Sequence, residues 1–458
     1  MRVIVCGAGQ VGSSIALYLA KEGNDLTVID TDVSLVNQLS EQIDLRAIVG
    51  HASHPDVLQQ AGADEADMLI AVTSSDEVNM VACQVCHSIF NIPTKIARIR
   101  SPAYRDEVHA DIFTRDHMPI DVIISPEAAV AEAILRRLRM PGAFDMIPLA
   151  DEKVKLVGVT CEEGCPIINT PLRQLTSLFP TLSIEIVGII RNDRAFVPTS
   201  DEQMLVGDQV YFVADSTHLH RAMAAFGHEE VEARRLLLLG GGNIGLNIAT
   251  RLEQDFTGVS VKLIEAYRTR AEEIAEILED TTVLHGDALE AEMLNEANIS
   301  EVETVIAVTN DDESNVLASL QAKRLGAKRT ITLINKPAYI PLVSSLGVDA
   351  VVNPRASTVS MILQHVRRGR IRAVHSLREG FAEVIEAEAL ETSPIVDKPL
   401  SEMRLDRGII IGAIVRGDEV IIPRPSTIVK PNDRVIIMSE TRDVKKVEEL
   451  FSVRLEFF

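Results

Sequence analysis

The sequence predicts an α/β fold with two parallel-sheet domains, each followed by a small α+β domain. Three observations predict it. The glycine pattern GxGxxG occurs at residues 7–12 and again at residues 240–245, each time directly after an apolar run. Short β-branched runs then alternate with helical patterns, which is typical of Rossmann-like sheets. Similar segments also recur along the two halves, so the chain is a tandem duplication.

The repeat extends well beyond the glycines. Val28-Ile29-Asp30 corresponds to Leu263-Ile264-Glu265, and Ala71-Val72-Thr73 corresponds to Ala307-Val308-Thr309. Each copy therefore contains one complete domain with the nucleotide-binding pattern, followed by a smaller domain.

The first part of each copy predicts a parallel sheet. Strands separated by helical segments form βαβ units with right-handed crossovers. We therefore expect Rossmann-like domains at residues 1–123 and 232–348. In the first copy the expected strands are 3–5, 26–29, 45–49, 68–72, 95–99 and 122–124, with helices at 13–21 and 33–42.

The second part of each copy predicts a compact α+β module, at residues 143–227 and 368–453. Helical segments at 128–138 and 357–366 are expected to join the two parts, with linkers at 141–142 and 227–230. In the first module the expected strands are 155–159, 183–190, 194–197 and 209–213, with a helix near 171–178.

Composition restricts the class of protein. The chain has 458 residues, a net charge of −22, no Trp and 4% aromatic residues. Such an acidic chain repels phosphate backbones and offers few stacking platforms, so no nucleic acid partner is expected. No apolar stretch is long enough to span a membrane, and the first residues do not resemble a signal peptide, so we expect a cytoplasmic protein.

The five cysteines are expected to be reduced thiols. Cys83, Cys86 and His87 match the CxxCH pattern of covalent haem attachment, but the same segment has helical spacing and no export signal precedes it. Core thiols are therefore the favoured interpretation. Cys161 and Cys165 could contribute to a zinc site only with a second paired motif. No metal site is predicted.

The first glycine pattern predicts a dinucleotide site. It comprises Gly7, Ala8, Gly9, Gln10, Val11 and Gly12. The first glycine permits the tight turn, the second lets a pyrophosphate approach, and the third allows close helix packing. The helix N-terminus attracts phosphate. Asp30 ends the second strand, where a carboxylate binds ribose hydroxyls and repels a 2′-phosphate, which favours NAD over NADP.

The second pattern repeats these features with Gly240, Gly241, Gly242, Asn243, Ile244, Gly245 and the acidic residue Glu265. Arg268 and Arg270 follow soon after and leave some room for an extra phosphate. A Rossmann-like unit that binds no nucleotide remains the alternative for each copy.

Further candidate contacts lie at the carboxyl ends of later strands, where open α/β sheets bind ligands. Strand-end turn chemistry explains the hydroxyl and amide positions equally well. Leu333 stands where the first copy has Arg98, so the two sites are not equivalent. The candidates are His51, Thr73, Ser74 and Arg98 in the first copy, and Asp287, Thr309 and Asn310 in the second.

No catalytic residue is predicted. A dehydrogenase needs an acid or base over the nicotinamide, yet the small modules share no His, Cys or Lys position, and no P-loop, HExxH or GxSxG motif is present. A non-enzymatic nucleotide sensor is therefore preferred. An NAD-dependent dehydrogenase with a duplicated fold and a scaffold with vestigial pockets remain the alternatives.

The chain resembles the TrkA family, the cytosolic regulatory subunits of the Trk potassium-uptake system. The resemblance covers essentially the whole chain. Its single-copy relatives are the regulator-of-potassium-conductance (RCK, or KTN) domains, which form gating rings under potassium channels. The residues that carry it are Gly7–Gly12 with Ile29-Asp30, Gly50-His51-Ala52, Ala97-Arg98-Ile99 and their counterparts in the second half.

The resemblance implies that the Rossmann-like domains bind NAD(H), and also ATP or ADP. It implies a homotetrameric ring of eight units on the cytosolic face of the inner (plasma) membrane, docked on a potassium-translocating subunit of the TrkH or TrkG type. The implied nucleotide contacts are Gly7–Gly12, Asp30, Thr73, Ser74 and Arg98, and in the second half Gly240–Gly245, Glu265, Thr309 and Asn310.

Overall fold

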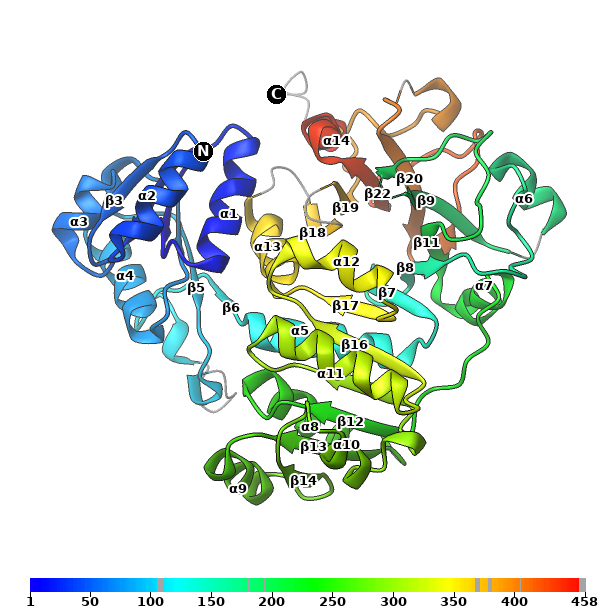
Figure 1. Cartoon of the computed structure of the whole chain (residues 1–458). Coiled ribbons are helices and arrows are strands. Elements are labelled where there is room, and N and C mark those ends of the chain that lie inside the picture. The colour runs from blue at the N-terminus through cyan, green and yellow to red at the C-terminus, as the bar shows by residue number, and fades with distance from the viewer. Residues whose placement is uncertain are drawn as a thin grey trace. The chain divides into compact units, whose positions relative to one another are not determined.

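The computed structural model describes residues 1–104, 111–179, 182–192, 194–366, 371–377, 381–403 and 405–452. The chain divides into two compact units. One comprises Met1–Ala129 with Arg355–Ile362, and the other comprises Val130–Pro354 with Leu363–Phe458. Figure 1 labels the helices and strands of both units.

The first unit contains a six-stranded parallel sheet in the order β3-β2-β1-β4-β5-β6. The strand order reverses between β1 and β4, which is the switch point where open α/β sheets bind ligands. The strands are β1 (Arg2–Cys6), β2 (Asp25–Asp30), β3 (Arg46–Val49), β4 (Met68–Ala71), β5 (Thr94–Arg98) and β6 (Val122–Ile124); the helices are α1 (Gln10–Lys21), α2 (Val33–Gln42), α3 (Pro55–Gln60) and α4 (Asp76–Ser88).

Burial explains why these segments are uniformly apolar. Every residue of β4 and all of β1 after Arg2 is buried, as is usual for central strands covered by helices on both faces. Helix α4 begins after Ser75, whose hydroxyl accepts the Val78 N–H. Cys83 and Cys86 lie on this helix and are fully buried in the domain core, as the helical spacing predicts.

The second unit contains a sheet of the same topology, in the order β14-β13-β12-β15-β16-β17. Both parallel sheets confirm the predicted Rossmann-like fold. The strands are β12 (Arg235–Leu239), β13 (Ser260–Glu265), β14 (Thr282–His285), β15 (Thr304–Ala307), β16 (Arg329–Leu333) and β17 (Ala350–Val352); the helices are α8 (Asn243–Asp255), α9 (Arg268–Ile277), α10 (Ala291–Glu296), α11 (Asp312–Arg324) and α12 (Ile340–Ser345).

The same unit holds both small modules, each built on a five-stranded antiparallel sheet, in the orders β10-β9-β11-β8-β7 and β18-β19-β22-β20-β21. Strand β7 was not expected from the sequence, and no strand positions were predicted for the second module. The first module comprises β7 (Ala143–Leu149), β8 (Val154–Thr160), α6 (Leu172–Leu178), β9 (Ile184–Arg191), β10 (Arg194–Phe196), β11 (Gln209–Asp215) and α7 (Leu219–Ala225); the second comprises β18 (Ile371–Leu377), β19 (Ala382–Glu388), β20 (Ile409–Arg416), β21 (Glu419–Ile421), β22 (Arg434–Glu440) and α14 (Val444–Leu450).

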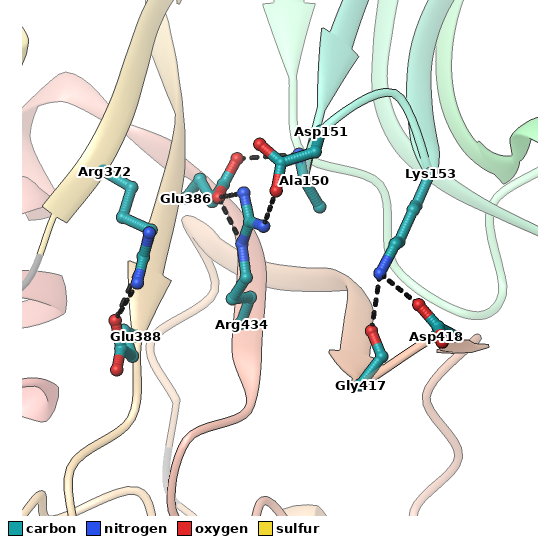
Figure 2. A network of polar contacts seen from close by, with 9 residues as sticks. All are labelled: Ala150, Asp151, Lys153, Arg372, Glu386, Glu388, Gly417, Asp418 and Arg434. Carbon is teal, nitrogen blue, oxygen red and sulfur yellow. Dashed lines mark hydrogen bonds and ion pairs between the residues drawn. The ribbon is translucent and has the colours of Figure 1, made fainter.

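The two small modules pack against each other through one shared apolar core. Val187 and Val213 of the first module lie in the same cluster as Val384 and Met438 of the second. The sheets approach so closely that a Cβ on Gly188 would lie 2.7 Å from the Met438 side chain. Polar contacts surround this core, and Figure 2 shows one network of them.

Two connecting helices link the parts of the repeat. Helix α5 (Pro126–Arg139) starts in the first unit, and its residues from Val130 onward belong to the second, where Ile134 and Leu138 join the core of the second Rossmann-like domain. Helix α13 (Pro354–Val366) contributes Arg355–Ile362 to the first unit. Each helix begins a few residues before the predicted segment.

The predicted domain boundaries stay a prediction, and the positions 368 and 453 lie outside the described residues. Among the residues that the structure describes, no helix combines the length and the apolar character needed to cross a membrane.

Candidate nucleotide-binding sites

The first glycine loop joins β1 to α1 at the switch point of the sheet. Gly7 has a positive φ of 109°, and its N–H donates to Ile29 O at 2.8 Å. A Cβ on Gly12 would lie 1.8 Å from Gly7 O, so the helix touches the loop directly. A Cβ on Gly9 would meet nothing within 4 Å, which leaves the face toward a ligand open.

The N-terminus of α1 is free to receive an anion. Gly9 is its N-cap, no side chain caps it, and its first turn contains no acidic residue. The helix therefore presents unpaired N–H groups and the positive end of its dipole at the loop. This is the arrangement that binds pyrophosphate in dinucleotide-binding folds.

The second loop, between β12 and α8, has the same geometry. Gly240 has φ 105°, and a Cβ on Gly245 would lie 2.0 Å from Gly240 O. Gly242 is the N-cap residue of α8, and no side chain caps this helix. A Cβ on Gly242 would again meet nothing within 4 Å. The duplication has thus preserved the phosphate-binding backbone in both halves.

Two carboxylates hold these loops. Asp30 accepts the Ala8 N–H at 2.6 Å through Oδ2 and the Asp32 N–H at 2.9 Å through Oδ1. Glu265 accepts the Gly241 N–H at 2.7 Å and the Tyr267 N–H at 2.9 Å. Each acid therefore joins the glycine loop to the end of the second strand, a positioning role that the sequence analysis did not foresee.

The second loop has a glycine, Gly241, beside its longer acidic side chain, Glu265. A Cβ on Gly241 would lie 2.3 Å from Ile274 Cδ1 and 3.0 Å from Glu265 Oε2, so a larger residue here would require these side chains to shift. The first site pairs Ala8 with the shorter Asp30. Arg270 donates to Gly241 O at 3.0 Å and also pairs with Glu273, so its guanidinium supports the loop.

Buried asparagines organise the next strand ends. Asn79 accepts from the Thr73 N–H at 2.9 Å and from the Thr73 hydroxyl at 2.7 Å, and it donates to Arg98 O at 3.0 Å. Asn315 makes the same contacts to Thr309 and Leu333 O. These asparagines tie β4 to β5 and β15 to β16. Their recurrence in both copies was the only sequence signal for them.

The remaining strand-end candidates take part in local turns. His51 Nδ1 lies 2.8 Å from Ser53 Oγ, and Asp287 accepts the Leu289 N–H at 2.9 Å. Ser74 O accepts from Arg100 at 2.7 Å. Nearby, the hydroxyl and N–H of Ser34 lower the pKa of Asp32 by hydrogen bonding.

Arg98 distinguishes the first site from the second. It pairs with Glu127 of α5 at 2.8 Å, with both side chains mostly buried. Arg98 Nε and Glu127 Oε2 are buried without a hydrogen-bond partner in the described residues. In the second copy Leu333 replaces the arginine, and Arg355 occupies the place of Glu127 at the start of α13. Glu127 was not predicted, because its partner Arg98 lies far away in the sequence.

The geometry defines a class of protein: a tandem pair of nucleotide-binding-type α/β domains with attached α+β modules. The TrkA-N domain family matches residues 3–126 and 236–354, and the TrkA-C domain family matches residues 156–227 and 384–452. These matches cover most of the chain, which therefore belongs to the TrkA family.

Relatives across the full length agree. The chain is 51% identical over 458 residues, 100% of both chains, to the Trk system potassium uptake protein TrkA of Azorhizobium caulinodans. It is 42% identical over 455 residues, 98% of each chain, to the protein of the same name from Vibrio alginolyticus. The chain is thus a potassium-uptake protein of this family and not a dehydrogenase.

Solved structures share the fold. The GsuK RCK domain has a TM-score of 0.62 at 18% identity, covering 98% of this chain and 94% of that one. The GsuK channel bound to NAD has a TM-score of 0.61 at 18% identity, covering 98% of this chain and 78% of that one. The tandem RCK architecture is therefore confirmed.

Proposed function

We propose that this chain is the nucleotide-sensing regulatory subunit of a potassium-uptake system and controls a membrane-embedded potassium-translocating subunit of the TrkH or TrkG type. The observation that carries the proposal is the pair of open, uncapped helix N-termini at Gly9 and Gly242, each beside a loop-bound carboxylate. The chain acts peripherally, on the cytosolic side of the plasma membrane.

The proposed ligands are NAD(H) and, at the same pocket, ATP or ADP. All of them contain an adenosine and a pyrophosphate, which suit the acid at the end of β2 and the uncapped helix. The NAD-bound GsuK channel supports the same assignment by analogy of fold. Arg98 supplies a cation for phosphate in the first site. The second site has Leu333 at this position and lacks the cation, so the first is the stronger nucleotide site.

The Arg98–Glu127 pair supplies a route for the signal. A phosphate that takes Arg98 leaves the Glu127 carboxylate without its cation, and Glu127 lies in the first turn of α5. The same helix continues into the core of the second Rossmann-like domain. Nucleotides whose phosphates contact Arg98 to different extents would therefore favour different ring conformations. Each nucleotide shifts the equilibrium between two conformations only as far as its affinities for them differ.

Exposed apolar residues support a homo-oligomer, and we propose a tetrameric ring of eight units. Val81 and Ile89 on α4 are 45% and 55% exposed, and Leu317 on α11 is 56% exposed. Val81 and Leu317 occupy matching places in the two copies. Large apolar side chains at equivalent exposed positions are typical of surfaces that bind other subunits.

The function is tested by potassium flux. The full chain is reconstituted with the translocating subunit of its own uptake system in liposomes, and flux is followed with NADH, NAD, ATP or ADP present. We expect flux that depends on the chain and changes with the nucleotide. Flux that ignores every nucleotide, or substrate-dependent NADH production at enzyme-like turnover, would contradict the proposal.

Replacing Asp30 by alanine should weaken NADH binding at the first site roughly 10- to 100-fold. This corresponds to the loss of charge-assisted hydrogen bonds worth about 1.5–3 kcal/mol. Part of the loss comes from the Ala8 N–H, which loses its acceptor and no longer orders the loop. Isothermal titration calorimetry of the full chain measures the affinity and the number of sites.

The matched control is Glu265→Ala, which should affect only the second site. Circular dichroism of both variants checks that the chain remains folded. An unchanged NADH affinity in a folded Asp30→Ala protein would rule out the ribose assignment.

A further inference from the structure

Tyr267 is a large aromatic side chain that lies exposed at the start of α9. It is 76% exposed. It is also the N-cap residue of α9, and no side chain caps this helix. Ser, Thr, Asp and Asn are the residues that stabilise an N-cap position, because their side chains accept N–H groups of the first helical turn. Neither burial nor helix capping therefore accounts for a tyrosine here.

The first copy has a capping residue at the same place. Asp32 is the N-cap of α2, and its carboxylate accepts the Ser34 N–H at 2.8 Å. Two backbone contacts establish that the positions correspond. The Asp32 N–H donates to Asp30 Oδ1 at 2.9 Å. The Tyr267 N–H donates to Glu265 Oε1, also at 2.9 Å. The residue after the ribose-binding acid thus stabilises its own helix in the first copy only.

A nucleotide in the second glycine loop would place its base beside Tyr267; this step rests on the function proposed above. A pyrophosphate at the N-terminus of α8 puts the adenosine ribose at the Glu265 carboxylate, where β13 ends. Glu265 accepts both the Gly241 N–H and the Tyr267 N–H, so it links the phosphate loop to the tyrosine. The adenine and the pyrophosphate are attached on opposite sides of the ribose ring. The base therefore extends away from the loop, toward the connection between β13 and α9.

We propose that Tyr267 stacks on the adenine of a nucleotide bound at the second site and makes this site selective for the base. The ring offers a π-face to the purine, and stacking removes apolar area of both rings from water. Stacking of a base on an aromatic side chain raises affinity roughly 5- to 100-fold. It therefore offsets part of what the second site lacks at Leu333, where the first site has Arg98.

The two sites then recognise different parts of the same nucleotide. The first site has Arg98 for the phosphates, and its N-cap residue Asp32 offers no ring. The second site has Tyr267 for the base and an apolar side chain in place of the arginine. The affinities of ADP and ATP, which differ only in their phosphates, should therefore differ less at the second site than at the first.

The first test uses the absence of tryptophan from the chain. Tyr267→Trp introduces a single tryptophan, so its fluorescence reports the second site alone. A stacked adenine quenches indole fluorescence. ADP should therefore quench the full-length variant in a saturable way, whereas inorganic pyrophosphate, which has no base, should not.

Two further variants separate stacking from folding. Tyr267→Phe retains the ring and should bind ADP at the second site as the unmodified chain does. Tyr267→Asn removes the ring but supplies a good N-cap, so α9 should form at least as well while ADP affinity at the second site falls roughly 5- to 100-fold. The matched control is Asp32→Asn, which should leave the second site unchanged. Calorimetry of the full chain measures affinities and the number of sites, and circular dichroism checks the fold.

Three outcomes would overturn this inference and leave the proposed function standing. They are ADP binding at the second site of Tyr267→Trp without quenching, equal quenching by pyrophosphate, and full ADP affinity in folded Tyr267→Asn. Fluorescence that follows protein concentration and ignores ADP would show instead that this residue contacts a second copy of the chain. A second site that binds no nucleotide in the unmodified chain would contradict the inference and the proposed function together.

Discussion

Gly12→Ala should destabilise the first Rossmann-like domain by about 3 kcal/mol and abolish nucleotide binding there. The added Cβ would lie 1.8 Å from Gly7 O and 2.9 Å from Gly7 C, both backbone atoms that no rotamer change can move. Helix α1 must then shift away from the loop, and its N–H groups no longer converge on the pyrophosphate position. Urea unfolding of the full chain measures the first effect, and calorimetry with NADH measures the second.

Gly9→Ala separates binding from folding in the same loop. Gly9 has φ −63° and ψ −172°, a conformation open to alanine, and a Cβ there would meet no protein atom within 4 Å. Its stability should equal that of the unmodified chain, yet the methyl group would occupy the face that a pyrophosphate approaches. Gly9→Ala should therefore bind NADH weakly in a fully stable protein.

The equivalent two substitutions in the second loop serve as controls. Gly245→Ala would place its Cβ 2.0 Å from Gly240 O, and Gly242→Ala would meet nothing. Both variants should leave the first site at full affinity. Normal NADH binding by Gly9→Ala would show that the nucleotide does not pass over this glycine, and the pyrophosphate assignment would then be wrong.

The sequence predicted most of the parallel sheets because central strands are apolar on both faces. Strands such as 122–124 appear at the predicted residues, and the predicted antiparallel strands of the first module differ by a residue or two. Strand β7 was missed. The Pro141-Gly142 turn precedes it, and β7 mixes polar with apolar residues without a clear alternation.

The site was only partly predictable, for a different reason. Local motifs identified the glycine loops and their acids, because each role depends on residues close together in the sequence. The pairing of Arg98 with Glu127 joins a strand to a distant helix, and no pattern in one sequence reveals it. The regulatory role in potassium uptake came from the family resemblance, which the full-length relatives confirm, and not from the residues' spacing.

The packing of the two small modules was also beyond sequence patterns. Gly188 and Gly412 were not singled out, yet each allows one sheet to touch the side chains of the other. A buried carboxylate completes this interface: Glu386, 3% exposed, accepts the Ala150 N–H at 2.8 Å and a guanidinium N–H of Arg434 at 2.7 Å. Figure 2 shows Arg434 reaching both Glu386 and Asp151.

Arg434→Met should destabilise the chain by about 3–5 kcal/mol, because it leaves the Glu386 carboxylate buried without its cation. Asp151 loses the same partner at little cost, since its side chain is 79% exposed. The Ala150–Glu152 turn has three consecutive positive φ values and is held by Glu386, so it should open first. Urea unfolding gives the total cost, and hydrogen exchange at Ala150 reports the turn.

Lys153→Met is the matched control at the edge of the same interface. Lys153 pairs with the fully exposed Asp418, so its loss should destabilise the chain far less than the loss of Arg434. Adding Glu386→Gln to Arg434→Met should recover part of the stability, because the neutral amide no longer carries a buried charge yet can still accept the Ala150 N–H. If Arg434→Met cost no more than Lys153→Met, the buried carboxylate would not be what joins the two modules, and their apolar core would have to account for the interface alone.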